Sequence, residues 1–152
     1  EDVEKILYHS KEENVFTLFD KIASRDFPGS LEVLGKVLLS RDTDPVQLLA
    51  GLLTQVRRLL ALRRLLDGRY DPQEAFASLN LRGKRMQRLY GEAARRYSTA
   101  ELESLVVLAA RFDLRLRALK TALAATLLEL FLYYAVVRGG RGPWAPEGLP
   151  RR

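Results

Sequence analysis

Explicit helix-start signals, repeated along the chain, restrict the fold more than any other feature of this sequence. The stretch "DPVQLLAGLLTQVRRLLALRRLLDG" opens with Asp44, whose carboxylate can cap free backbone amides, and Pro45, which suits the first turn of a helix. "DPQEAFASL" repeats the Asp-Pro start at Asp71, and "STAE" at 98–101 is a full capping box. No segment has the alternating pattern of a strand. We therefore predict an all-α bundle of about six to eight helices.

Apolar residues recur every three or four positions between these signals, which is the spacing of a helix with one buried face. The two early faces are Val15, Leu18, Phe19 and Ile22, and Leu31, Leu34, Val37 and Leu38. The face after Asp44 consists of Leu49, Leu52, Leu53, Val56, Leu59, Leu60 and Leu66. The face after "STAE" consists of Leu102, Leu105, Val106, Ala109, Phe112 and Leu116. Gly68 is expected to end the long helix in the left-handed conformation.

The last apolar run, "ALAATLLELFLYYAVV" at 122–137, is too short for a bilayer span. A transmembrane helix needs about 20 apolar residues, whereas this run has 16 and is interrupted by Glu129. We therefore expect a buried terminal helix and no contact with a membrane. The following "RGGRGPWAPEGLPRR" is rich in Gly, Pro and Arg and is expected to be a mobile tail.

The residues that most enzymes and metal sites need are scarce. The chain has no cysteine, and its only histidine is His9. No Gly-rich loop with Lys-Ser or Lys-Thr is present, and no carboxylates have the spacing of a metal site. Asp113 and Arg117, four apart, predict a helical ion pair. We expect no catalytic residues, no cofactor and no metal, and hence a binding or structural module rather than an enzyme.

Charge is distributed unevenly along the chain, whose formal net charge is +6. Residues 1–54 carry 6 basic and 10 acidic groups, a balance of −4. Residues 55–70 carry 5 arginines against one aspartate (+4), and residues 80–97 carry 6 basic groups against one glutamate (+5). A basic middle favours contact with a polyanion or an acidic partner, although a solvated arginine-rich face gives the same pattern. The candidate contacts for DNA phosphate or a partner protein are Arg82, Lys84, Arg85, Arg88, Arg95 and Arg96.

The stretch "LNLRGKRMQRLYGEAARRY" at 79–97 has the layout of a DNA-reading helix-turn-helix. A recognition helix must expose polar side chains to base edges. Here the inner face of the second helix would be Met86, Leu89, Tyr90 and Ala93, and its outer basic residues could meet phosphate or solvent. The motif therefore fits either a sequence-specific DNA-binding regulator or a corner in a helical scaffold.

Three blocks, taken in order, resemble the C-terminal part of the delta subunit of bacterial DNA polymerase III, a clamp-loader subunit. The blocks are "EDVEKIL…ENVFTLFDKIASRD", "DPVQLLAGLLTQVRRLLALRRLL" and "SLNLRGKRMQRLYGEAARRYSTAELESLVVLAARFDLRLR", within roughly residues 1–137. Two departures occur. "RGKRM" stands where a proline is expected, and Arg117-Ala118-Leu119 where Lys, a small residue and Gly are expected. The second leaves open whether the helices near 117–121 are separate or continuous.

The resemblance implies a helical collar domain, through which clamp-loader subunits assemble into a ring that loads the sliding clamp onto primed DNA. Residues 1–12 would end a preceding lid domain, 13–138 would form the collar, and 139–152 would be a flexible tail. The partners implied are the other clamp-loader subunits. The basic stretch adds an expectation of weak non-specific DNA contact, and since no signal peptide is visible we expect a cytoplasmic location. The clamp-binding element would lie in an N-terminal domain outside this sequence, so we expect no clamp binding by this piece.

The chain opens Glu1-Asp2-Val3 and its only methionine is Met86, as expected for a piece of a longer protein. An independent helix-turn-helix regulator and an unrelated helical adaptor are the alternatives.

Overall fold

The computed structural model describes residues 2–119 and 121–144, and these residues are almost entirely helical. They contain seven α-helices, one 3-10 turn (η1) and one π-helical segment (η2), and no strand, which confirms the predicted all-α fold. The elements are α1 (Asp2–Ala23), α2 (Phe27–Leu38), α3 (Pro45–Asp67), α4 (Pro72–Ser78), α5 (Lys84–Arg96), α6 (Thr99–Ala118), η1 (Thr121–Leu123), α7 (Ala124–Leu132) and η2 (Tyr133–Val137).

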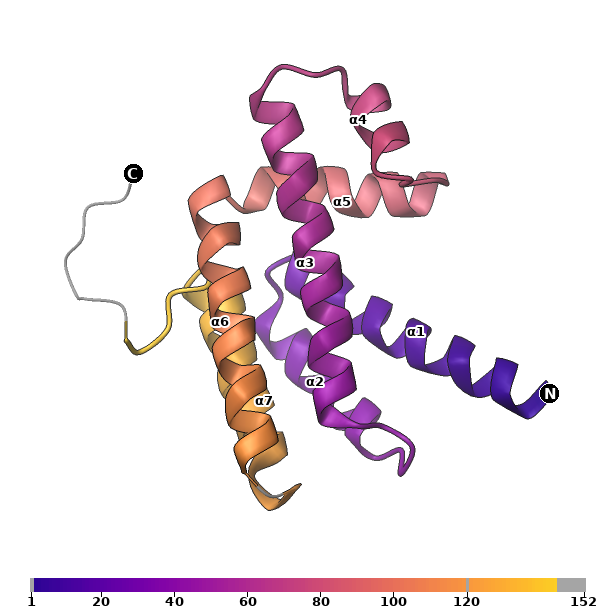
Figure 1. The fold of residues 1–152 in the computed structure, drawn as a ribbon, viewed down its shortest axis with the longest axis vertical. Coiled ribbons are helices and arrows are strands. Elements are labelled where there is room, and N and C mark those ends of the chain that lie inside the picture. Colours follow the sequence, from indigo (N-terminus) through magenta and orange to yellow (C-terminus); the bar gives the residue numbers. More distant parts are fainter. Residues whose placement is uncertain (1, 120, 145–152) are drawn as a thin grey trace.

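Helix α3 is the centre of the bundle (Figure 1). It lies along α6 over much of its length and also contacts α1, α4, α5 and α7. Helix α5 runs across the bundle near the C-terminal half of α3, whereas α7 lies beside α6, and the N-terminal half of α1 projects from the body (Figure 1). The arrangement surrounds α3 with partners, which explains its wide apolar face.

The predicted apolar faces supply most of the core. Leu18, Phe19 and Ile22 of α1 are each 1% exposed, and so are Leu105 and Phe112 of α6. Other predicted positions that are buried are Leu34, Val37, Leu49, Leu52, Val56, Leu59, Leu60, Leu102, Ala109 and Leu116. Those that are only partly buried at its edge are Val15, Leu31, Leu38, Leu53, Leu66 and Val106. Helical periodicity alone therefore identified the inward sides of α1, α2, α3 and α6.

The predicted helix starts are also confirmed. An Asp44 carboxylate oxygen accepts a hydrogen bond from the Val46 amide at 2.9 Å. Both halves of the capping box are made: Ser98 Oγ accepts from the Glu101 amide, and a Glu101 carboxylate oxygen accepts from the Ser98 amide, each at 3.1 Å. The predicted pair of Asp113 and Arg117 is present at 2.9 Å.

The end of α3 differs from the expectation. Gly68 has φ −77°, and the left-handed residue is Arg69, with φ 63°. Asp67 pairs with Arg63 within the helix at 2.9 Å. The reversal falls one residue later, where the Tyr70 amide donates to the Leu65 carbonyl. Arg69, for which a positive φ has a steric cost, therefore adopts the conformation that was expected for glycine.

The helices on either side of residue 120 are separate. Helix α6 ends at Ala118, Leu119 is extended with φ −100° and ψ 147°, and the chain resumes helical structure in η1 and α7. This answers the question that the Arg117-Ala118-Leu119 departure left open.

The run 122–137 is not buried throughout, contrary to the expectation of a buried terminal helix. One side of α7 and η2 packs into the core through Leu128, Phe131, Leu132, Ala135 and Val136. The opposite side leaves Leu123, Leu130, Tyr133 and Val137 substantially exposed. We call these four side chains the outer α7 face. No helix within the described ranges is both long and apolar enough to cross a membrane.

Packing continues past the predicted start of the tail at residue 139. Gly140, with φ 90°, lies so close to α6 that an added Cβ would stand 2.6 Å from the Leu105 backbone nitrogen. Trp144 then packs on Phe112, with ring centroids 6.2 Å apart. The packed part of the chain thus extends to residue 144 rather than ending at 138, and residues 145–152 of the predicted tail lie outside the described residues. At the other end, the boundary expected between residues 12 and 13 falls inside the continuous helix α1.

Candidate functional site: the basic face of α5

The turn that leads into α5 is held by an arginine from α3. After α4 ends at Ser78, Asn80 has φ 55° and the Leu81 amide donates to the Phe76 carbonyl. One Arg58 Nη then donates to the carbonyls of Leu79 and Asn80, at 3.0 and 3.1 Å. Helix α5 begins after Gly83, whose φ of 87° explains the glycine there. The corner between α4 and α5 is thus set from outside the motif.

The inner face of α5 is anchored in the core. Leu89, Tyr90, Ala93 and Ala94 are buried, and the Tyr90 ring lies 5.4 Å from the Phe19 ring. The Tyr90 hydroxyl donates to the side-chain oxygen of Gln55 on α3. Burial raises the pKa of Tyr90 to about 12, and the nearby Arg58 guanidinium partly opposes that shift. Helix α5 is therefore clamped between α1 and α3, and only its other side is free.

The C-terminal end of α5 is tied to three other segments. Arg63 donates to the Ala94 carbonyl at 2.7 Å, and Arg25 donates to the Arg96 carbonyl at 3.0 Å. Arg25 also pairs with Glu101 at 3.1 Å. Cations at the last carbonyls of a helix are favoured by its dipole. These two arginines therefore stabilise the end of α5 and are not available to a ligand.

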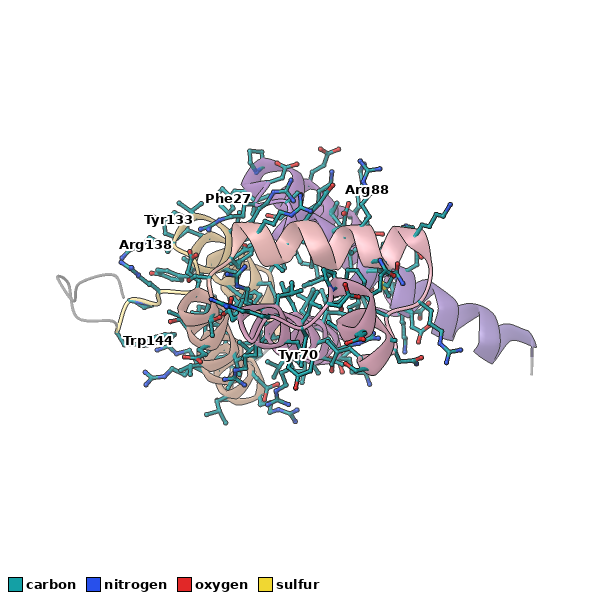
Figure 2. All side chains as sticks on the ribbon, turned by 90° about the horizontal axis from the view of Figure 1, so that it is seen from above. Phe27, Tyr70, Arg88, Tyr133, Arg138 and Trp144 are labelled. Carbon is teal, nitrogen blue, oxygen red and sulfur yellow. The ribbon has the colours of Figure 1, made fainter. Side chains whose placement is uncertain are left out.

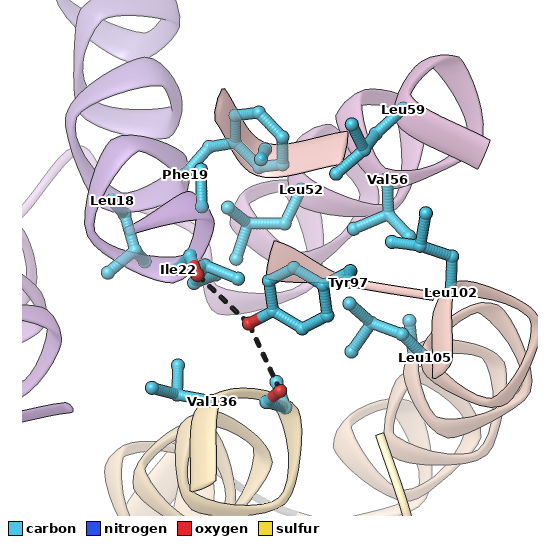
Figure 3. Packing of buried hydrophobic residues seen from close by; sticks show 14 of the residues in the cluster. Leu18, Phe19, Ile22, Leu52, Val56, Leu59, Tyr97, Leu102, Leu105 and Val136 are labelled. Carbon is cyan, nitrogen blue, oxygen red and sulfur yellow. Dashed lines mark hydrogen bonds between the residues drawn. The ribbon is translucent and has the colours of Figure 1, made fainter. Parts of the chain in front are cut away.

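Tyr97, which lies between α5 and α6, connects the C-terminal end of α5 to the buried interior (Figure 3). Its hydroxyl is directed at the carbonyls of Ile22 and Ala135, at 2.9 and 3.2 Å. The residue is 1% exposed, and desolvation by burial is the main cause that raises the pKa of Tyr97. The position of α5 is therefore fixed by buried polar contacts as well as by apolar packing.

Five of the six predicted basic contacts lie on one side of α5. At 100° per residue, Lys84, Arg85, Arg88, Arg95 and Arg96 fall within an arc of about 120°, over a length of about 18 Å. All five are exposed, as is Arg82 in the preceding turn. Figure 2, which looks down on α5, shows Arg88 directed away from the core. The structure thus brings the predicted residues together as one surface.

Two glutamates share this surface. Glu13 of α1 lies 3.4 Å from Arg85, whose guanidinium also stacks on Phe16 at 4.2 Å. Glu92 pairs with Arg88 at 3.3 Å and with Arg96 at 3.7 Å. Six basic groups minus these two carboxylates leave a local balance of +4. Exposed pairs of this kind contribute only about 0–1 kcal/mol each, so a polyanion could displace them.

The placement of Glu13 weighs against sequence reading by α5. In a helix-turn-helix, the N-terminal residues of the second helix contact base edges. Here a carboxylate of α1 stands beside Arg85 in the first turn of α5. Negative charge there opposes the approach of DNA.

Sequence reasoning did not separate the structural arginines from the exposed ones. Arg58 and Arg63 were part of the basic stretch 55–70, and both donate to backbone carbonyls of α4 and α5 segments. The outer α7 face was also missed, although one charged residue in 16 was a signal that the run lacked a polar side.

Similarity to known proteins extends over most of this chain. Residues 12–135 match the family model of the DNA polymerase III delta subunit, C-terminal domain. The chain is 28% identical to DNA polymerase III subunit delta of Bacillus subtilis (strain 168) over 138 residues, 91% of this chain and 39% of that protein. The solved structure of the Bacillus subtilis DNA clamp loader delta protein (YqeN) is similar with a TM-score of 0.69 and 26% identity, over 84% of this chain and 37% of that one. The chain thus spans less than two fifths of the length of these relatives.

The fold and the exposed side chains define this chain as an all-α domain with a basic outer face on α5 and an apolar outer face on α7. The match over residues 12–135 then identifies the family. The chain belongs to the DNA polymerase III delta subunit family and corresponds to its C-terminal domain.

Proposed function

We propose that this chain is the collar domain of a DNA polymerase III delta subunit, a non-catalytic module that assembles the clamp loader during DNA replication. The match to the C-terminal domain of that family over residues 12–135 carries the proposal. The similar solved structure is described as a clamp loader delta protein. Residues 1–12 would end a lid domain, because the family match begins at residue 12.

The surface of the domain supports an assembly role over a regulatory one. The basic face of α5 is partly neutralised by Glu13 and Glu92. The outer α7 face offers large apolar side chains to a partner. Exposed apolar patches of this kind mark contacts with proteins rather than with DNA bases.

Co-purification with clamp-loader subunits tests the proposal. The chain would be co-expressed with the remaining clamp-loader subunits of its source organism and analysed by size-exclusion chromatography. We expect it to elute with them, and we expect no complex with the sliding clamp alone. Arg85→Glu combined with Arg88→Glu is the control for the basic face, and this variant should assemble like the parent.

Selection from a random DNA pool tests the regulator alternative in the same preparation. A sequence-specific regulator prefers its site by a factor of about a thousand or more. We expect a pool without a consensus. A strong consensus, or a chain that elutes apart from all clamp-loader subunits, would overturn the collar assignment.

A further inference from the structure

The outer α7 face contains four of the nine exposed large apolar side chains among the described residues. Leu123, Leu130, Tyr133 and Val137 are 51%, 42%, 36% and 50% exposed. Between residues 121 and 137 the only charged side chain is Glu129. The outward sides of α5 and α6, in contrast, carry several arginines each. A helix that is apolar on all sides is normally buried on all sides, so the water-facing side of α7 lacks the cover that its composition requires.

The shape of this face fits one helix. Its four large side chains are spaced by seven, three and four residues, close to the spacing of a helix–helix seam, and they come from η1 (Leu123), α7 (Leu130) and η2 (Tyr133 and Val137). From Leu123 to Val137 the seam is about 20 Å long. The exposed apolar area is of the order of 300 Å², at the lower end of the range for the largest apolar patch on a typical monomer. A stable interface removes about 800 Å² from each partner, so the occupant extends past α7, towards Phe27 of α2, whose ring lies 5.9 Å from that of Tyr133.

Charge indicates that the occupant of this face is a different chain and not a second copy of this one. In a two-fold pair of α7 helices, centred on Leu130, the Glu129 carboxylates of both copies would meet. Arg138 follows the seam on the same side of the molecule as Tyr133 (Figure 2) and has no ion pair with another described residue. A partner with a carboxylate at that end complements it.

We infer that the outer α7 face binds an amphipathic helix of a neighbouring clamp-loader subunit, with an acidic residue of that helix facing Arg138. The inference rests on the proposed function and adds to it the surface that makes the contact.

Single-cysteine labelling tests the contact without disturbing it, because the chain has no native cysteine. Val137→Cys and Leu130→Cys probe the face. Val107→Cys on α6 is the matched control, since Val107 is 49% exposed and Val137 is 50% exposed. The rate of reaction with a fluorescent maleimide is measured for the free chain and for the chain assembled with the clamp-loader subunits of its source organism. We expect assembly to slow labelling at residues 130 and 137 at least 10-fold and at residue 107 less than 2-fold.

The outcomes separate this inference from the proposed function. A chain that does not assemble refutes both. A chain that assembles but is labelled at residue 137 at the free rate, or is equally protected at 107 and 137, refutes the inference and leaves the collar assignment standing. Protection of residue 137 in the chain alone, with dimers seen by sedimentation, would point to a second copy instead. Protection by phosphatidylglycerol vesicles alone would point to a membrane. Either result refutes the inference.

The acidic partner is tested by charge reversal. Arg138→Glu should slow association with the same subunits several-fold at low salt and much less at high salt. Arg41→Glu, in the turn between α2 and α3, is the control, because Arg41 is exposed and lies outside both the outer α7 face and the basic face of α5. It should leave the rate within 2-fold of the parent. Equal rates for the parent and the Arg138→Glu variant would refute the acidic contact.

Discussion

Tyr97→Phe removes one hydroxyl from the point where α1, the α5–α6 junction and η2 meet, and leaves the ring in place. The hydroxyl is shared between the carbonyls of Ile22 and Ala135, at 2.9 and 3.2 Å, inside a site that is 1% exposed. The Ile22 carbonyl keeps the Arg25 amide as a donor at 3.0 Å. The cost should therefore lie between one net hydrogen bond, about 1 kcal/mol, and an unsatisfied buried carbonyl, up to about 3 kcal/mol. We expect a loss of about 2 kcal/mol, which lowers Tm by about 4–8 °C in a domain of this size.

Urea unfolding followed by far-ultraviolet circular dichroism measures this loss. Tyr70→Phe is the matched control, because Tyr70 is 57% exposed and should leave the free energy of unfolding unchanged. An unchanged slope with a lower midpoint is the expected result for the Tyr97 variant. A midpoint equal to that of the parent would refute the argument that the hydroxyl ties these three segments together.

Four further predictions follow from individual contacts. Phe112→Ala should cost about 3–5 kcal/mol in urea unfolding, because the ring is 1% exposed; an unchanged midpoint would contradict its place in the core. Arg69→Gly should raise the free energy of unfolding by about 1 kcal/mol, since glycine adopts φ 63° without steric cost, whereas a loss would show that the arginine has an unseen role. Changing Arg85 and Arg88 to Ala should lower the salt slope of weak, non-preferential DNA binding by up to ~2 in an anisotropy titration, and an unchanged slope would exclude both from phosphate contact. The raised pKa of Tyr90, about 12 against 10.0, means that its stabilising effect is complete below pH 10 and is lost as pH rises from about 10 to 12. Tyr90→Phe should remove about 1.4 kcal/mol per pH unit from that alkaline decline, and equal declines in both proteins would refute the shift.

Local signals predicted the helices and the core well. The capping box of Ser98 and Glu101 involves residues three apart, so its two hydrogen bonds depend only on the chain between them. The inward faces of α3 and α6 follow from the 3.6-residue period of the helix, which is equally local. The ordered blocks also sufficed for the family, and the family match over 12–135 confirms that resemblance.

Contacts between distant segments could not be predicted in this way. Arg58 and Arg88 are both arginines on predicted helices, yet one holds the carbonyls of Leu79 and Asn80 and the other faces solvent. The difference depends on which segment folds against each helix. The left-handed Arg69 is a local exception, since the reversal that closes the hydrogen bond from the Tyr70 amide to the Leu65 carbonyl lies one residue after the glycine.

The sequence by itself determined the helical class, the helix starts, the buried faces and the family, because each depends on spacing within a few turns or on the order of blocks. It also placed five of the predicted basic residues on one side of α5. Only the tertiary structure decided that Glu13 of α1 adds a second carboxylate to that side, and that packing reaches Trp144. It alone showed that α7 buries one apolar side and exposes the other. Apolar residues at helical spacing look the same in a sequence whether they are buried by their own chain or by another protein. Only the positions of the surrounding helices distinguish the two cases.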